Sequence, residues 1–156
     1  MKTAVRILVI ALGVAPLAAA DPAGFSIWKA AGLKSHDAAL STQVGADHSS
    51  RETLADYGDH RFRMLYRDAD GNPEQHDQII DIVIVQSGQG TLQLGGTMVG
   101  KRQTTAGEFV GTRLDGGDSH PLGPGDIVHI PATIPHSFLV SSGQHLTYVL
   151  LKIPAK

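Results

Sequence analysis

Two histidine-bearing segments, sixty residues apart, contain the side chains of this sequence that are best suited to chemistry. His76 lies in PEQHDQIIDIVIVQSGQG, and His136 lies in GPGDIVHIPATIPHSF. In each segment a side chain that can bind a metal ion adjoins an apolar, β-branched run typical of a buried strand. Two such segments in one chain indicate a polar site built into a β-structured interior.

The alternation of side chains along these segments predicts which polar residues share that interior. Glu74 and His76 are two residues apart and therefore lie on one face of a strand. A loop through residues 77–80 resets the alternation, so that Asp81 also points inward. Imidazole and carboxylate groups buried together cost roughly several kcal/mol unless they are paired or bound to a cation. We therefore expect a divalent metal ion bound by His76, Asp81 and His136, with Glu74 as a further ligand.

The types of ligand atom limit the identity of the metal to a group of divalent ions. Nitrogen and oxygen ligands without sulfur suit Fe(II), Mn(II), Zn(II), Ni(II) or Cu(II). The alternative is a site without metal, in which His76 and Asp81 form a hydrogen-bonded pair and His136 is a satisfied interior residue. In that case the interior binds an organic ligand directly, or binds nothing.

Other prominent side chains have simpler expected roles. Arg61, Arg63 and Arg67 alternate with apolar residues, so we predict that they form the solvated face of a strand. At most one of them would form an ion pair with an acidic ligand of the site. Trp28 and Phe25 are expected to anchor the amino-terminal segment on the main domain or on a second subunit.

The remaining histidines are predicted to be solvated, in turns, in the polar amino-terminal part or on outward-facing strand positions: His36, His48, His120, His129 and His145. His60 differs because it directly precedes a strand and can reach the rim of the interior.

The elements that must position the two histidines are strands. From residue 60 onward short apolar alternations recur between Gly-rich and Pro-rich turns, and residues 79–96 form a hairpin pattern around Ser87–Gly90. The stretch DGGDSHPLGPG, residues 115–125, is interpreted as a turn region. Strands at this regular spacing predict an all-β sandwich or barrel. One or two short helices are expected in residues 25–44.

The amino terminus has the layout of a secretory signal peptide. Lys2 and Arg6 precede an apolar run, and the small-residue stretch ending at Ala20 suits cleavage before Asp21. The run is too short and too interrupted for a membrane span. The expected organisation is a signal peptide at 1–20, an amino-terminal helical or extended segment at 21–57, and a barrel domain at 58–156, in the periplasm or secreted.

Composition agrees with one exported domain. The chain has 156 residues, of which 42% are hydrophobic, and it has no cysteine, so the core must stabilise the fold without disulfides. Removing residues 1–20 takes away two of the 13 basic residues and none of the 15 acidic ones, which leaves a net charge of −4. This balance argues against nucleic acid or an anionic membrane surface as a partner.

Residues 58–153 resemble a single-domain cupin, a β-barrel of the jelly-roll type. The first cupin motif, G-x5-H-x-H-x3or4-E-x6-G, is matched from its first ligand onward by Glu74-x-His76-x4-Asp81-x6-Gly88. The second motif, G-x5-P-x-G-x2-H-x3-N, is matched by Gly125, Pro131 and His136. The chain departs from these motifs where Glu74 replaces a His, Asp81 a Glu, Thr133 a Gly and Val140 an Asn.

The resemblance implies three kinds of function. The first is a metal-dependent enzyme of dioxygenase or isomerase type, in which the metal acts on a small organic substrate and Glu74, if free, is the base. The second is a non-catalytic periplasmic binding or sensor protein without metal. The third is a structural role as part of a homodimer. No nucleophile triad, phosphate-binding loop or dinucleotide motif appears in the sequence, so whether the protein is an enzyme stays open.

Overall fold

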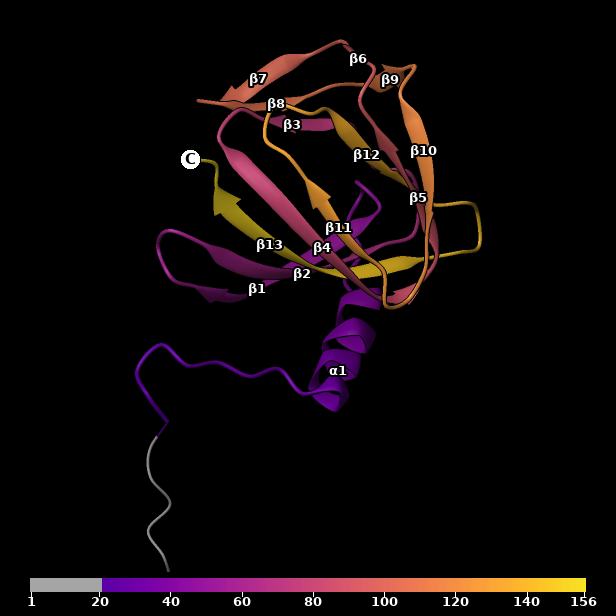
Figure 1. Ribbon diagram of the computed structural model, residues 1–156. Coiled ribbons are helices and arrows are strands. Elements are labelled where there is room, and N and C mark those ends of the chain that lie inside the picture. Colours follow the sequence, from indigo (N-terminus) through magenta and orange to yellow (C-terminus); the bar gives the residue numbers. More distant parts are fainter. Residues whose placement is uncertain (1–20) are drawn as a thin grey trace, which may run out of the picture.

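The computed structural model describes residues 21–156, and the predicted signal peptide at 1–20 lies outside them. Within these residues two antiparallel sheets face one another, and a helix, α1 (Ala30–Ser41), packs outside (Figure 1). In the order of pairing, the five-stranded sheet contains β1 (Ser49–Asp56), β2 (Arg61–Arg67), β13 (Leu146–Pro154), β4 (Ile79–Gly88) and β11 (Ile127–Ile130). The six-stranded sheet contains β10 (Asp118–Leu122), β5 (Gly90–Leu94), β12 (His136–Leu139), β3 (Glu74–His76), β8 (Glu108–Val110) and β7 (Arg102–Thr105). A small third sheet joins β6 (Thr97–Val99) to β9 (Arg113–Asp115).

The expected all-β jelly roll with one amino-terminal helix is therefore present. The five-stranded sheet begins at Ser49, so the extended part of the amino-terminal segment supplies its edge strand. No helix in residues 21–156 has the length and apolar character needed to cross a membrane.

The hairpin predicted around Ser87–Gly90 is wrong, because β4 and β5 lie in different sheets and do not pair. The turn between them instead joins the two sheets. Gly88 ends β4 with a φ of 74°, and a Cβ there would lie 2.0 Å from the carbonyl oxygen of His145. Only glycine satisfies both the left-handed backbone and the close approach. The chain thereby passes from one sheet to the other without a long connection.

The interpretation of residues 115–125 as a turn region is wrong for half of its length. Gly116 and Gly117 do turn the chain, with φ of 78° and 86°. Residues Asp118–Leu122 then form β10, which pairs with β5 at the edge of the six-stranded sheet. Pro121 is tolerated because an edge strand need not donate a hydrogen bond on its open side.

The faces of β2 are the reverse of those predicted. Met64 is fully buried on the side covered by the helix, and Phe62 packs on Trp28 with ring centroids 4.9 Å apart. The opposite face, with Arg63 and Arg67, lines the interior of the barrel. The prediction that these two arginines form a solvated face is therefore wrong, because the amino-terminal segment covers the apolar side of the strand. Arg61, at the strand end, is exposed as expected.

The Asp37 carboxylate helps to attach α1 to the five-stranded sheet. The hydroxyl of Ser87 on β4 donates to one oxygen of Asp37 at 2.6 Å, and the hydroxyl of Thr147 on β13 donates to the other at 2.7 Å. Thr147 has no solvent exposure, so this contact satisfies a fully buried hydroxyl. The helix is thus bonded to the two central strands.

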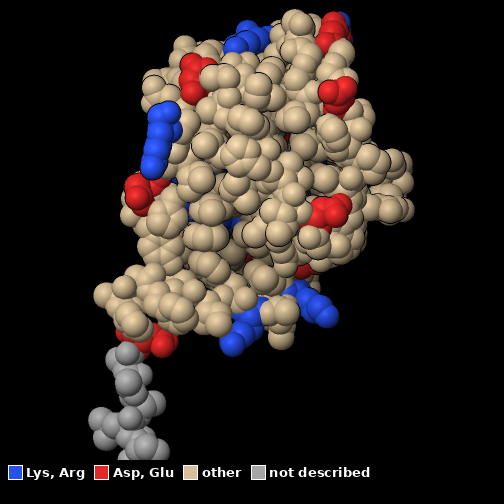
Figure 2. Space-filling view, in the orientation of Figure 1, with Lys and Arg blue, Asp and Glu red and all other residues tan. Residues whose placement is uncertain are grey.

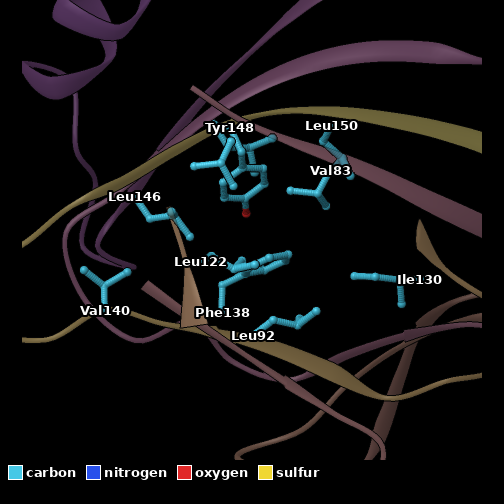
Figure 3. Packing of buried hydrophobic residues seen from close by; sticks show 11 residues of the cluster. Val83, Leu92, Leu122, Ile130, Phe138, Val140, Leu146, Tyr148 and Leu150 are labelled. Carbon is cyan, nitrogen blue, oxygen red and sulfur yellow. The ribbon is translucent and has the colours of Figure 1, made fainter. Parts of the chain in front are cut away.

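The apolar core lies between the sheets (Figure 3). Val83 and Val85 point inward from β4, and Phe138 of β12 stacks on Tyr148 of β13 with ring centroids 4.8 Å apart. Asp81 precedes Val83 by two residues and shares its inward face. The core therefore continues directly into a polar end of the barrel, where the candidate site lies.

Candidate metal centre

Strand pairing brings the two predicted histidines together. Glu74 of β3 lies opposite His136 of β12, which places His76 and His136 side by side with ring centroids 5.4 Å apart. The two histidines are 5% and 3% exposed, respectively. Residues sixty positions apart thus form one buried pair, as the alternation of the two segments predicted.

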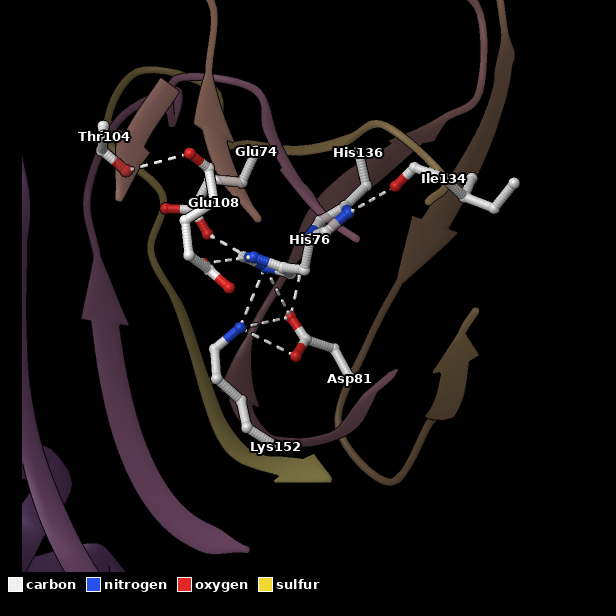
Figure 4. Close-up of polar contacts among 8 residues, drawn as sticks. All are labelled: Glu74, His76, Asp81, Thr104, Glu108, Ile134, His136 and Lys152. Atoms are coloured by element: carbon white, nitrogen blue, oxygen red, sulfur yellow. Dashed lines mark hydrogen bonds and ion pairs between the residues drawn. The ribbon is translucent and has the colours of Figure 1, made fainter. Parts of the chain in front are cut away.

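The outer nitrogen of each imidazole has an acceptor of its own (Figure 4). His76 Nδ1 lies 2.6 Å from Glu108 Oε2, and His136 Nδ1 lies 3.1 Å from the carbonyl oxygen of Ile134. A carbonyl or carboxylate oxygen only accepts, so both Nδ1 atoms carry the proton and donate. The Nε2 lone pairs of both rings therefore face the interior, where that of His76 accepts from the Lys152 ammonium at 2.9 Å. Outer hydrogen bonds of this kind give the same orientation to histidines that bind metal.

Oxygen atoms approach the same two Nε2 atoms. Asp81 Oδ2 lies 3.4 Å from His76 Nε2 and 3.6 Å from His136 Nε2, while Glu74 Oε2 lies 3.7 Å from His76 Nε2. Glu74, His76 and His136 each offer a ligand atom within 4.8 Å of the others. Acceptors that converge in this way repel one another unless a cation lies among them.

Asp81 differs from Glu74 because it already has a cationic partner. Lys152 Nζ lies 2.8 and 2.9 Å from the two oxygens of Asp81 and 2.9 Å from His76 Nε2. Burial by itself raises the pKa of Asp81, but contacts with His136, His76 and Lys152 outweigh burial and hold that pKa well below its usual range. Asp81 is thus ionised and shared between the ammonium and the site.

Lys152 and Glu108 were not among the residues predicted from the sequence. Lys152 follows Tyr148 and Leu150 at intervals of two, so strand alternation alone could have placed it on the inward face. Glu108 comes from β8, which pairs with β3 and sets Glu108 opposite His76. Nothing in the local sequence around Glu108 indicates that pairing.

The site opens into a cavity of about 300 Å³ between the sheets. Apolar side chains form one part of its wall: Leu65, Phe109, Phe138, Tyr148 and Leu150. Charged side chains form another part: Asp47, Arg51, Arg63, Arg67, Glu74, Asp81, Arg102, Glu108 and Lys152. The other histidines do not line this cavity, and His129 is exposed as predicted. His60 lines a neighbouring pocket that shares Glu108 and Lys152 with the site.

Comparisons with known proteins agree with the jelly-roll architecture. No known protein family matches the sequence, and no curated protein matches it. Among solved structures, KdgF from Halomonas sp. is similar with a TM-score of 0.51 and 20% identity, over 70% of this chain and 82% of that chain. A cupin-2 domain protein from Rhodospirillum rubrum has a TM-score of 0.50 and 16% identity, over 68% and 60% of the two chains.

A third solved structure is the DMSP lyase DddQ from Ruegeria pomeroyi, with a TM-score of 0.50 and 18% identity, over 71% of this chain and 51% of the lyase. At these identities the likeness shows the fold and not the reaction. Together with the facing antiparallel sheets, these neighbours show that the described residues have a cupin-type jelly-roll β-barrel fold.

Proposed function

We propose that this protein is an exported cupin that binds a divalent metal ion in its barrel and acts on a small organic molecule there. The observation that carries the proposal is the orientation of His76 and His136. Both donate a hydrogen bond from Nδ1–H to an outer acceptor, and their Nε2 atoms face the carboxylates of Asp81 and Glu74. Nitrogen and carboxylate acceptors that converge in this way suit a divalent cation.

The residues fit the metal that the cupin resemblance implies. Two imidazole nitrogens and a carboxylate oxygen suit Fe(II), Mn(II), Zn(II), Ni(II) or Cu(II). His76, His136 and Glu74 would hold the ion, with Asp81 as a fourth ligand when it leaves Lys152. When bound, such an ion polarises an oxygen atom of the substrate.

The remaining chemistry belongs to side chains around the cavity. The Glu74 side chain is 45% exposed, so it can accept a proton from a molecule in the cavity when it is not a metal ligand. Phe138, Tyr148 and Leu65 exclude water from one wall. The likeness to a DMSP lyase supports the idea that a barrel of this kind houses catalysis.

A location outside the cytoplasm is part of the same proposal. The basic, apolar and small-residue sequence of residues 1–20 supports export, and the absence of cysteine is compatible with an oxidising compartment. Sequencing the amino terminus of protein recovered from the periplasm or the medium tests this part. We expect it to begin at Asp21, and recovery of the whole chain from the cytoplasm alone would contradict it.

A second candidate function is ligand binding without metal, and one observation favours it. The Lys152 ammonium lies 2.9 Å from His76 Nε2 and also contacts both oxygens of Asp81, so the chain supplies a cation of its own at the edge of the site. In this case the barrel would bind or sense an organic ligand without turnover.

Metal analysis separates the two candidates. The protein would be purified without added metal and compared with His76→Ala, His136→Ala and, as a control on an exposed strand position, His129→Ala. We expect about one metal ion per chain in the wild type and the control, and loss of the ion in the other two variants. A wild-type protein that carries no metal and binds none on titration would overturn the metal proposal in favour of the second candidate.

A further inference from the structure

We propose that the cavity recognises the carboxylate group of a small organic acid through Arg63 and Arg67. This proposal adds a substrate class to the proposed function. It rests on the proposed function only for the location of the reacting site. On the face shown in Figure 2, basic side chains are scattered among acidic ones, whereas these two arginines face the cavity together. Arg63 and Arg67 therefore place two positive charges close together in the wall of the cavity.

The two arginines share a face of β2. Arg63, Leu65 and Arg67 alternate along the strand, and all three line the cavity. Both arginines are half-buried, and within residues 21–156 neither forms an ion pair. Arg51, by contrast, pairs with Asp47 at 3.3 Å. Arg63 and Arg67 are therefore the guanidinium groups of the cavity that combine burial with the lack of an acidic partner.

The Arg67 guanidinium also has an unsatisfied donor. Its Nε is buried, and it has no hydrogen-bond partner among the described residues. A buried donor left without an acceptor is unfavourable, so the Arg67 guanidinium is not fully satisfied by the described residues. Arg63 has a related disadvantage, because burial and the nearby charges of Arg61 and Arg51 lower its pKa. An anion in the cavity would supply the negative charge that both guanidinium groups lack.

The surroundings select a carboxylate with an apolar body. A guanidinium binds a carboxylate through two parallel hydrogen bonds, which fixes its position as well as its charge. Glu74 and Glu108 also line the cavity and oppose a more highly charged group such as phosphate. Phe138 stacks on Tyr148 beside this wall and offers an apolar face to the rest of the molecule. The volume of about 300 Å³ limits the ligand to a small one.

Gly71 offers a way to disturb this recognition without removing a charge. A Cβ at residue 71 would lie 2.6 Å from Arg67 Nη1 and 2.7 Å from its Cζ, so an alanine there must push the guanidinium aside. The far end of an arginine moves at little cost, and the backbone of Gly71 is not in the left-handed region. Gly71→Ala should therefore fold and still displace Arg67.

Calorimetric titration with matched acids and amides tests the inference. The probes are benzoate and lactate, each compared with its amide, and inorganic phosphate. We expect at least one acid to bind at least tenfold more tightly than its amide. Arg63→Gln and Arg67→Gln should each weaken that binding at least tenfold, and Gly71→Ala about threefold. Arg61→Gln, on the same strand but exposed and outside the cavity, should stay within twofold.

Three outcomes would overturn the inference: no acid binds, an amide binds as tightly as its acid, or Arg61→Gln loses as much affinity as the cavity variants. Phosphate that binds more tightly than every acid, and loses affinity in Arg63→Gln, would also overturn it. Thermal unfolding checks that each variant is folded. If Arg67→Gln does not fold, Arg63→Gln and Gly71→Ala decide the question.

The same titration separates this inference from the metal proposal. It would be repeated after treatment with phenanthroline, a neutral chelator, because a polycarboxylate chelator could itself enter the cavity. Arg63→Gln should keep the wild-type metal content while it loses acid binding. Protein that carries no metal as purified and binds none on titration, but binds acids through Arg63, would overturn the metal proposal alone. Metal-loaded protein that does not bind acids would overturn the carboxylate inference alone.

Discussion

Lys152 lies directly opposite Asp81 in the pairing of β13 with β4, and its ammonium contacts both carboxylate oxygens, at 2.8 and 2.9 Å. The lysine side chain is 14% exposed and that of Asp81 is 3% exposed. Removing one partner of an ion pair that is so little exposed strongly destabilises the protein, because the other charge is then buried alone. A metal ion bound by His76 and Asp81 would compete with Lys152 for the same acceptors.

Replacing Lys152 with Met should therefore weaken the metal-free protein and strengthen metal binding. We expect the free energy of unfolding in the presence of a chelator to fall by about 3 kcal/mol, since the Asp81 carboxylate loses its partner. Added Zn(II) should restore most of the loss, and Zn(II) affinity should rise at least tenfold. Denaturant unfolding with and without Zn(II) measures both effects. Lys34→Met on the exposed face of α1 should change neither, and equal Zn(II) affinity in Lys152→Met and wild type would show that the ammonium does not compete.

The hydrogen bond between His76 and Glu108 should tune metal affinity without contacting the ion. Glu108→Gln leaves a weaker, uncharged acceptor for His76 Nδ1, and we expect the affinity for Zn(II) to fall about 10- to 100-fold. Competition with a chromogenic chelator measures this change. Asp115→Asn, in an exposed pair with Arg113, is the matched control. An unchanged affinity in Glu108→Gln would rule out a role for this contact in orienting His76.

Tyr148 should make the fold sensitive to alkaline pH. Burial raises the pKa of Tyr148 to about 12, only partly offset by nearby Arg67. Because the folded protein favours the neutral phenol, its stability is complete below pH 10 and declines as pH rises from about 10 to about 12, by roughly 2–3 kcal/mol. Unfolding by urea at pH 9 to 12 measures the decline. Tyr148→Phe should lose this part of it, whereas Tyr57→Phe should keep it, and an identical pH profile in Tyr148→Phe would contradict the assignment.

Thr133 adopts a left-handed backbone just before the second histidine, with a φ of 70°. The conformation is unfavourable for a β-branched residue by about 1–2 kcal/mol, and its N–H donates to the carbonyl of His76 at 2.7 Å. Thr133→Gly should therefore raise the free energy of unfolding by about 0.5–1 kcal/mol, after the entropic cost of glycine. Thr53→Gly, at an exposed strand position, should lower it instead. A loss of stability in Thr133→Gly would mean that the threonine side chain contributes more than its backbone costs.

Local patterns were enough to predict the fold and the meeting of His76 with His136. Strand alternation and two motif-like segments carry that information, because side-chain parity is set by neighbouring residues. Lys152 and Glu108 depend instead on which strands pair and in what register, as the alignment of Lys152 with Asp81 shows. The register of strands that are far apart in the sequence depends on the whole barrel and cannot be deduced from the sequence of either strand alone.

The arginines of β2 show a second limit of sequence patterns. Alternation correctly separated Arg63 and Arg67 from Met64, but it could not tell which face is covered by the amino-terminal segment. Asp118–Leu122 shows a similar ambiguity. Its proline and polar residues suggested a turn, but the segment forms a strand at the edge of a sheet, where such residues are tolerated.

The burial of Met64 shows that the amino-terminal segment is part of the hydrophobic packing of the barrel. In most small barrels the apolar face of a strand fills the inside, but β2 turns that face outward, under α1 and Trp28. The helix acts as an external core, and the space it frees inside is what permits a water-accessible cavity with arginines in its wall. Loss of the segment would leave a hydrophobic stripe on the outside of the barrel. The barrel therefore depends on the amino-terminal segment to cover its apolar face, and its interior can hold charged side chains instead.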